Sequence, residues 1–369
     1  MRLSFPHMGT SVIPLAYLFE EMGHEVIRPD RPTGDTLTLG ARYAPEFACI
    51  PFKLVLGTYL ETLRENDVDV LLSGGGCGPC RAGYYGDLHR RILEDMGYDF
   101  EMIFFFPPLK TPRDTYEKIR RLKPGIAWTR LISILSVVWE KLKALDELEI
   151  RANQVRVAER FRGNTTKTFE RATSLIDEAR TRKAVRIARD EALALINQVP
   201  QVDTQEAPLK IGVIGEIYVQ LEPTANFYLE EKLGELGAYV QRSLFLSGFT
   251  QTDVVRLGAK DIQELAKPYL PENVGGHGQN SIGETILYAE KGFDGVIQLA
   301  PFTCIPEIVA KSIIPSLSET LDLPVLTLFI DEQTGDAGVD TRLEAFTDLL
   351  RSKKRRARGQ AEPVSPSLR

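Results

Sequence analysis

Cysteine is scarce in this sequence, which has four in 369 residues. So few cysteines cannot form the disulfide framework that stabilises small secreted proteins, and a reducing cytoplasm is the expected location. Long apolar runs are also missing, and none approaches the roughly 20 residues that a membrane-spanning helix needs. In the opening stretch, MRLSFPHMGTSVIPLAYLFEEMG, no basic segment precedes a long apolar one, so we expect no signal peptide.

Neither sign of charge dominates. The 45 basic and 51 acidic residues leave a net charge of −6, which gives no reason to expect a nucleic acid or an anionic membrane as partner. A hydrophobic content of 43% and a charged content of 26% are ordinary for a globular protein. The length exceeds that of one average domain, so the sequence predicts at least two domains, each with a full core.

Short apolar runs alternate with helix-period segments in the first third of the chain. RLSFP, HEVIRP, VDVLLS and DFEMIFFF are typical of strands, and apolar residues recur at helical spacing over 15–22, 55–63 and 81–97. The segment 29–49, rich in turn-forming residues, is predicted as a loop. This alternation predicts an α/β fold with a parallel, doubly wound sheet.

The middle of the chain has no proline between Pro124 and Pro200 and is rich in Ala, Glu, Lys, Leu and Arg. We predict two or more helices there, packed against or between the flanking lobes. From Leu209 the α/β alternation returns, and KLGELGAYVQRS and GFDGVIQLAPFTC echo the earlier LFEEMGHEVIRP and DVDVLLSGGGCGPC. The predicted parts are an α/β lobe (1–112), a helical segment (113–207), a second α/β lobe (208–353) and a disordered tail (354–369).

All four cysteines fall where a loop leads into a helix. Cys77 and Cys80 follow the predicted strand VDVLLS, Cys304 follows GVIQLA, and Cys49 precedes the helix that starts near residue 51. Open α/β sheets bind ligands at the carboxyl edge of their strands. A helix N-terminus also favours thiolate over thiol, which suits metal ligation.

Three kinds of site would use these cysteines. A redox dithiol would use Cys77 and Cys80 but would not need the other two. A structural zinc ion would take all four, whereas an iron–sulfur cluster would accept three thiolates and leave one iron to another ligand. A lone Cys49 or Cys304 is otherwise a small buried apolar residue. The histidines show no metal-binding spacing, and the glycine-rich loop around His277 either approaches a ligand or forms a flexible turn.

Five segments together resemble the 2-hydroxyacyl-CoA dehydratase superfamily, and within it the branch of CoA-protein-activase or acyl-CoA dehydratase activase-related proteins. They are APEFACIPFKLVLG, GGGCGPCRAGYYGDLHRRILEDMGY, IGVIGEIYV, GFDGVIQLAPFTCIPEIVAKSIIP and LPVLTLFIDEQTGDAGVDTRLEAFTDLL. The resemblance covers most of the chain apart from the helical middle and the tail. It implies two Rossmann- or flavodoxin-like lobes with parallel sheets, a helical portion, and a [4Fe–4S]-type cluster held between the lobes on three cysteines.

At the matching positions the expected cluster ligands are Cys49, Cys80 and Cys304. Cys77 either substitutes for Cys80 or takes no part. Arg81 either reduces the electrostatic cost of holding a negatively charged cluster or guides an acidic substrate. Alternatively, it is an ordinary residue of a helix N-terminus paired with a carboxylate. We expect Glu216 and His277 to line the same cleft.

The family's electron donor is a separate, ATP-hydrolysing activator protein. The absence of GxGxxG and GxxxxGK motifs here agrees with that division of labour. The resemblance therefore implies low-potential electron transfer, or a reductive reaction, driven by the activator. The alternatives are a non-enzymatic cluster carrier or scaffold for the activator, and a zinc-binding structural protein. An apolar stripe on the middle helices (Phe169, Leu175, Ile176 and Val185) favours a homodimer or pairing with a related subunit.

Overall fold

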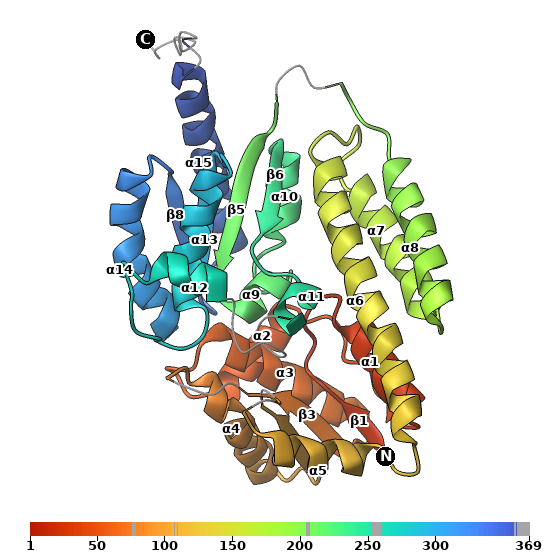
Figure 1. The fold of residues 1–369 in the computed structure, drawn as a ribbon. Coiled ribbons are helices and arrows are strands. Elements are labelled where there is room, and N and C mark those ends of the chain that lie inside the picture. Colours follow the sequence, from red (N-terminus) through yellow and green to blue (C-terminus); the bar gives the residue numbers. More distant parts are fainter. Residues whose placement is uncertain are drawn as a thin grey trace.

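Two lobes, each built on a four-stranded parallel sheet, make up most of the molecule (Figure 1). The computed structural model describes residues 1–75, 79–106, 108, 110–203, 207–251, 260–357 and 359. The first sheet has the order β2-β1-β3-β4, from β1 (Arg2–Ser4), β2 (Glu25–Val26), β3 (Val70–Gly74) and β4 (Glu101–Phe105). The second has the order β6-β5-β7-β8, from β5 (Leu209–Gly215), β6 (Ala238–Arg242), β7 (Gly295–Pro301) and β8 (Val325–Ile330).

Both sheets have the same strand order. In each lobe the second strand lies at one edge next to the first strand, and the third and fourth strands follow on the opposite side of the first. Every pair of neighbouring strands is parallel. The predicted α/β fold with two parallel-sheet lobes is therefore confirmed. The echo between the two halves of the sequence corresponds to a repeated topology.

Helices cover both faces of the first sheet. They are α1 (Val12–Glu21), α2 (Gly34–Tyr43), α3 (Ile50–Glu65), α4 (Ala82–Asp95) and α5 (Pro112–Leu122). Successive residues of β3 point to opposite faces, so Val70 and Leu72 pack in the core that contains α1, and Leu71 packs in the core under α3 and α4. Both faces of this sheet are thus buried, as is usual for a parallel sheet.

Helix α2 contradicts the prediction of a loop over residues 29–49. Thr33 caps this helix, because its side chain accepts a hydrogen bond from the backbone N–H of Thr36 and the Thr36 side chain accepts one from the backbone of Thr33. One of the turn-forming residues in this segment, Gly40, serves helix packing instead. A Cβ on Gly40 would lie 1.7 Å from the backbone oxygen of Lys53 in α3, so only glycine permits this close approach.

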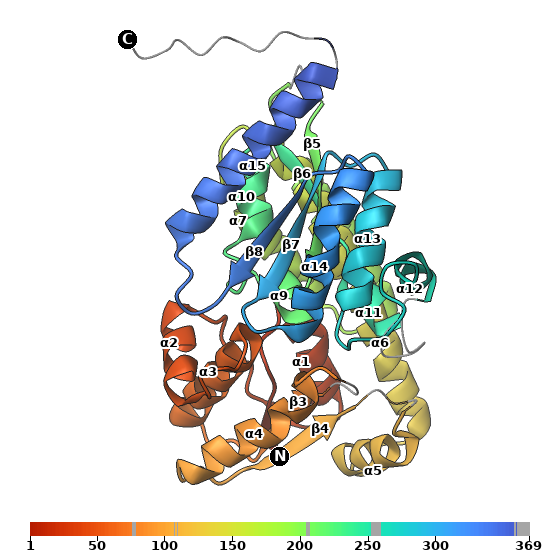
Figure 2. The same ribbon diagram turned by 90° about the vertical axis from the view of Figure 1, so that its left-hand side faces the viewer.

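The second lobe is also covered on both faces (Figure 2). Its helices are α9 (Ile217–Leu221), α10 (Leu229–Glu235), α11 (Leu246–Phe249), α12 (Lys260–Ala266), α13 (Gly278–Glu290), α14 (Ile305–Thr320) and α15 (Asp336–Ala357). α10 and α15 pack on one face, and α13 and α14 on the other. Because α15 continues to Ala357, the boundary predicted at 353 falls inside a helix.

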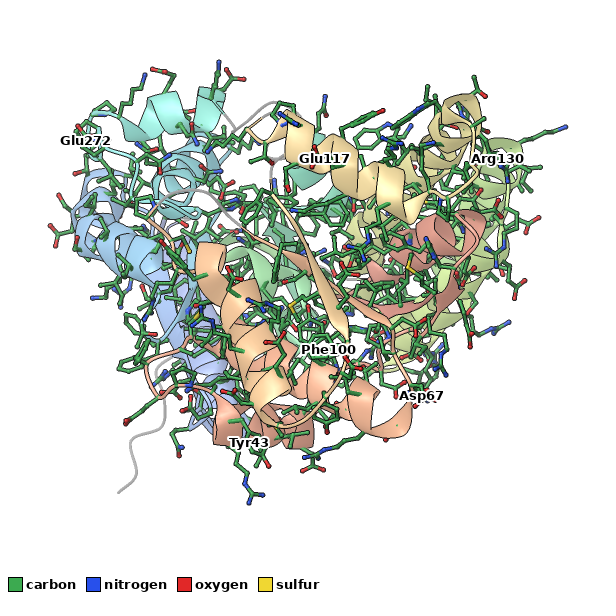
Figure 3. All side chains as sticks on the ribbon, turned by 90° about the horizontal axis from the view of Figure 1, so that it is seen from below. Tyr43, Asp67, Phe100, Glu117, Arg130 and Glu272 are labelled. Carbon is green, nitrogen blue, oxygen red and sulfur yellow. The ribbon has the colours of Figure 1, made fainter. Side chains whose placement is uncertain are left out.

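Three helices form the middle of the chain: α6 (Trp128–Arg156), α7 (Asn164–Glu178) and α8 (Arg182–Asn197). As predicted, they pack against the flanking lobes. α6 contacts α1 of the first lobe and also β6, α10 and α11 of the second, and it runs beside both lobes in Figure 1. Figure 3 shows Glu117 of α5 and Arg130 of α6 along one edge of the first lobe. The middle helices share one continuous core with that lobe.

The apolar stripe that favoured a dimer is covered within the chain. Ile176 and Val185 are buried, and Phe169 and Leu175 pack against the same core. This stripe therefore gives no ground for self-association. In the part of the chain that the structure describes, none of the helices combines the length and apolar character needed to cross a bilayer.

Lys141 of α6 is fully buried, and its ammonium donates hydrogen bonds to the backbone oxygens of Ile176 and Asp177. Burial lowers its pKa from 10.5 to about 8. Between pH 8 and pH 10.5 the unfolded chain therefore binds more protons at this group, and its contribution to the free energy of unfolding rises with pH. We expect wild-type protein to gain stability relative to Lys141→Met across that window, as measured by urea denaturation at a series of pH values.

The matched control is Lys143→Met, because this lysine lies on the same helix with a side chain 41% exposed. Its side chain is not buried, so no comparable gain over this variant is expected. An equally small gain over Lys141→Met would contradict the role given to burial.

Candidate cofactor site between the two lobes

The three described cysteines line one cavity. Cys49, Cys80 and Cys304 all border a space of about 510 Å³ whose walls come from both lobes. Cys49 is the N-cap of α3 and Cys304 the N-cap of α14, while Cys80 directly precedes Arg81, the N-cap of α4. The predicted placement at loop-to-helix junctions is confirmed for these three. Cys77 lies outside the described residues.

The repeated topology explains why the cysteines meet. Cys80 follows β3 and Cys304 follows β7, which are the third strands of their sheets. The helix before each third strand is α3 in one lobe and α13 in the other, and their N-caps are Cys49 and His277. Three of these four equivalent positions therefore carry cysteine and the fourth carries histidine.

The thiols are protonated in the protein without a bound metal. Burial, together with the nearby Glu216 carboxylate, raises the pKa of Cys49 to about 11. The pKa values of Cys80 and Cys304 are also raised, again chiefly by burial. Burial therefore opposes the thiolate form, which the helix N-termini were expected to favour. A redox dithiol at Cys77 and Cys80 would need a lowered pKa at its attacking thiol, whereas the pKa of Cys80 is raised.

Tyr85 and His89 of α4 fill the wall beside Cys49. The Tyr85 hydroxyl lies 2.6 Å from the sulfur of Cys49, and the His89 ring stacks on Phe52 with centroids 4.0 Å apart. Burial lowers the pKa of His89 to about 4, so its ring is neutral. The sequence analysis did not single out either residue. The signal was the helical spacing of Arg81, Tyr85 and His89, which places all three on the same face of α4.

Arg81 joins the two cysteine loops across the lobes. Its guanidinium donates hydrogen bonds to the backbone oxygen of Phe47, at 3.0 Å, and to the backbone oxygen and hydroxyl of Thr303. Phe47 stands two residues before Cys49, and Thr303 directly precedes Cys304. Among the described residues Arg81 pairs with carbonyl oxygens rather than with a carboxylate, so its charge stays beside the cavity that it lines.

Thr303 has a strained backbone. Its φ is +70°, in the left-handed region that costs a residue with a side chain about 1–2 kcal/mol. The Thr303 hydroxyl donates to the backbone oxygen of Phe47 at 2.9 Å, and Arg81 binds both of these residues. These contacts hold the strained turn in place and thereby fix the direction in which the chain enters Cys304.

Glu216 and His277 lie differently with respect to the cavity. Glu216 lines it and caps α9 by accepting a hydrogen bond from the backbone N–H of Val219 at 3.0 Å. Burial raises the pKa of this carboxyl. His277 is buried and is not among the described residues that line the cavity. The loop before it does approach the site, since a Cβ on Gly275 would lie 2.7 Å from the backbone nitrogen of Cys80.

The cavity offers the room and the three thiols that a cluster would need. Among the described residues, no three His, Cys, Asp or Glu side chains lie close enough together to hold one metal ion. A tetrahedral zinc with bonds of about 2.3 Å would bring its thiolates to within about 4 Å of one another. A cluster distributes its thiolates over several irons, so they stand farther apart around a common space. Eight cluster atoms, each given the roughly 30 Å³ of a water molecule, would fill about half of the 510 Å³ cavity.

Comparison with known proteins assigns no family to the chain: no family model matches it, and no curated protein matches it significantly. The resemblance to the 2-hydroxyacyl-CoA dehydratase superfamily therefore remains a prediction from the quoted segments.

Proposed function

We propose that this protein holds a [4Fe–4S]-type cluster on Cys49, Cys80 and Cys304 and takes part in low-potential electron transfer or a reductive reaction driven by an ATP-dependent activator protein. The observation that carries the proposal is the meeting of three thiols, from both lobes, on one cavity. Such a cluster supplies one-electron chemistry and, with three thiolate ligands, one iron open to another ligand.

Of the charged residues that line the cavity, Arg81 favours an anionic cofactor and Glu216 opposes one. Assembly must displace a proton from each thiol, and iron supplies the driving force because it stabilises the thiolate form. Arg81 places a positive charge beside the resulting negative centre, and its hydrogen bonds position the loops of Cys49 and Cys304. Tyr85 is within hydrogen-bonding distance of the Cys49 sulfur, at 2.6 Å, and hydrogen bonds to sulfur are one means by which proteins set a cluster's potential.

Apolar side chains next to the cysteines offer a docking surface for the activator. The exposed members are Phe47, Tyr84, Phe302, Ile305 and Ile308. The hydrogen bond between Thr303 and Phe47 brings the loops of Cys49 and Cys304 together, so residues from both lobes meet at this surface. Exposed aromatic groups of this kind are typical of interface anchors. An electron donor docked here would stand close to the cysteines.

The proposal is tested by reconstituting the cluster anaerobically and adding the cognate activator, ATP and a reductant. One electron should then pass from the reduced activator to this protein, and the spectrum of the reconstituted centre should change accordingly. Without ATP the change should not occur. If the redox state stays unchanged in the complete mixture although the cluster is present, the protein is a carrier or scaffold rather than an electron acceptor.

Substituting Tyr84 by aspartate should slow this reduction at least about tenfold, the equivalent of 1.4 kcal/mol of lost binding, while iron content stays the same. Tyr84 is 75% exposed, so the substitution leaves the core intact. The control is Phe161→Asp, since Phe161 is 57% exposed in the connection between α6 and α7, away from the cysteine loops. Equal rates in the two variants would rule out this docking surface.

A further inference from the structure

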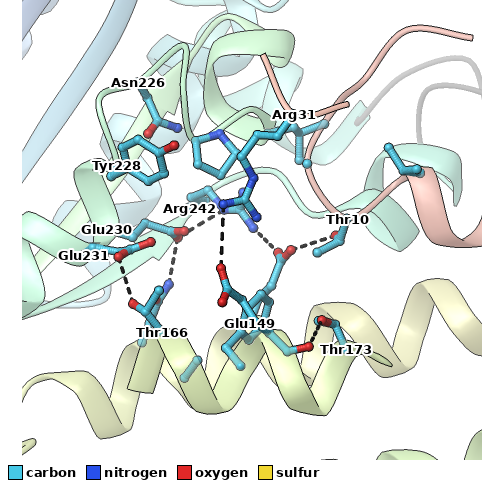
Figure 4. A pocket seen from close by; sticks show the side chains of 18 of the residues that line it. Thr10, Arg31, Glu149, Thr166, Thr173, Asn226, Tyr228, Glu230, Glu231 and Arg242 are labelled. Atoms are coloured by element: carbon cyan, nitrogen blue, oxygen red, sulfur yellow. Dashed lines mark hydrogen bonds and ion pairs between the residues drawn. The ribbon is translucent and has the colours of Figure 1, made fainter. Parts of the chain in front are cut away.

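A second cavity lies where the three parts of the chain meet. This junction cavity, of about 240 Å³, is lined by His7, Thr10 and Arg31 of the first lobe, by residues of α6 and α7, and by residues of the second lobe from Leu221 to Arg242. Figure 4 shows its polar side chains pointing into the space between the elements. It shares none of its described lining residues with the cysteine cavity.

Most of its buried charges are paired with one another. The guanidinium of Arg242 is ion-paired with Glu149 and with Glu230, and the hydroxyl of Thr10 donates to Glu149 at 2.8 Å (Figure 4). The amide of Asn153 donates to Glu230 at 2.7 Å. These contacts tie α6 to both lobes, and Glu149, Glu230 and Arg242 are ion-paired without any ligand, although the Nε of Arg242 has no hydrogen-bond partner.

Two opposite charges that line the same cavity are left over. Arg156 is 7% exposed, and its described hydrogen bond goes to the amide oxygen of Asn153, while its Nε has no partner. Glu231 accepts a hydrogen bond from the hydroxyl of Thr166 at 2.8 Å. Neither Arg156 nor Glu231 forms an ion pair with any described residue. A guanidinium has five N–H donors, and a buried one that lacks an anion is costly.

The position of Arg156 depends on a glycine. A Cβ on Gly234 of α10 would lie 2.6 Å from Cδ of Arg156, so the glycine leaves room for the arginine side chain where α6 crosses α10. The aliphatic part of the side chain is thereby held against the second lobe, and the residue lines the cavity.

We propose that the junction cavity binds a small zwitterion, an amino acid, whose carboxylate pairs with Arg156 and whose ammonium pairs with Glu231. A carboxylate can accept two parallel, charge-assisted hydrogen bonds from a guanidinium. The volume equals about eight water molecules of roughly 30 Å³ each, which suits a free amino acid. Because the walls come from all three parts of the chain, the ligand also stabilises their association.

The test measures binding of each proteinogenic amino acid, added singly at millimolar concentration, to the full-length protein. A thermal-shift screen finds the amino acids that raise the melting temperature, and calorimetry then gives their affinity. At least one should bind saturably. Its deaminated analogue and its decarboxylated analogue should each bind at least about tenfold more weakly, because each lacks one of the two charges.

Two variants locate the site. Arg156→Gln and Glu231→Gln should each weaken binding of the same amino acid at least about tenfold. The matched controls Arg162→Gln and Glu235→Gln change an exposed pair of the same residue types outside the cavity and should leave affinity unchanged. If Arg156→Gln does not fold, Glu231→Gln decides alone. The proposal is wrong if no amino acid binds, if the deaminated analogue binds as tightly, or if Glu231→Gln binds normally.

Discussion

Replacing Cys304 by serine is expected to abolish assembly of the iron–sulfur cluster, and the same is expected for Cys49→Ser and Cys80→Ser. Each sulfur lines the shared cavity, and with three ligands available the loss of one leaves too few to hold a cluster. The loss of bound iron should exceed the roughly 10–100-fold effect of removing an outer-shell partner. Iron and acid-labile sulfide per chain, after anaerobic reconstitution, measure the outcome.

Cys77→Ser is the matched control for these variants, because it removes a cysteine from the same segment. On the sequence-based assignment it should retain most of the iron and sulfide. A protein that instead holds one zinc ion per chain and no sulfide would contradict the cluster proposal. If Cys77→Ser lost all iron and sulfide while Cys80→Ser retained them, the cluster ligand would be Cys77 rather than Cys80.

Substituting Arg81 by alanine should lower the affinity for the cluster about 10–100-fold, the usual cost of removing an outer-shell partner. Without the guanidinium, the loops before Cys49 and Cys304 lose the hydrogen bonds that join them across the lobes. The strained Thr303 would then be free to relax. The measurement is the rate at which an iron chelator removes the cluster. Arg81→Lys should behave similarly, because one ammonium cannot reproduce the planar fork of a guanidinium.

Arg90→Ala provides the comparison for Arg81. It lies on the same helix, α4, and pairs with Asp87 and Glu94 on the exposed side. The chelator should remove the cluster from the Arg90→Ala variant at the same rate as from the wild-type protein. If the chelator removed the cluster from the Arg81 variants at the wild-type rate as well, Arg81 would not position the cysteine loops.

The strands, the parallel sheets and the junction position of the cysteines could be predicted because they depend on local signals. Buried strands such as Val70–Gly74 are short apolar runs, and the carboxyl edge of a parallel sheet follows from the alternation of strand and helix. Helix α2 was missed because Gly40, which normally signals a loop, is required there by contact with Lys53, 13 positions along the chain. That contact is tertiary, and no local pattern encodes it.

The contacts of the site were harder to predict than its members. Arg81 was identified from its place in the motif, yet its partners, Phe47 and Thr303, lie 34 and 222 residues away. The burial of Cys49, which raises its pKa, was also not predicted, since the depth of burial of a side chain is set by both lobes together. The junction cavity had no sequence signature, because Arg156 and Glu231 look like ordinary charged residues of amphipathic helices.

The shared strand order of the two sheets makes the two lobes repeats of one topology within a single polypeptide. In a true homodimer, a site on the axis presents two identical approaches, and a substitution on one side is necessarily repeated on the other. A single polypeptide lacks that constraint. The corresponding N-cap positions of α3 and α13 already carry different residues, Cys49 and His277. Each half can therefore be altered by mutation without a matching change in the other.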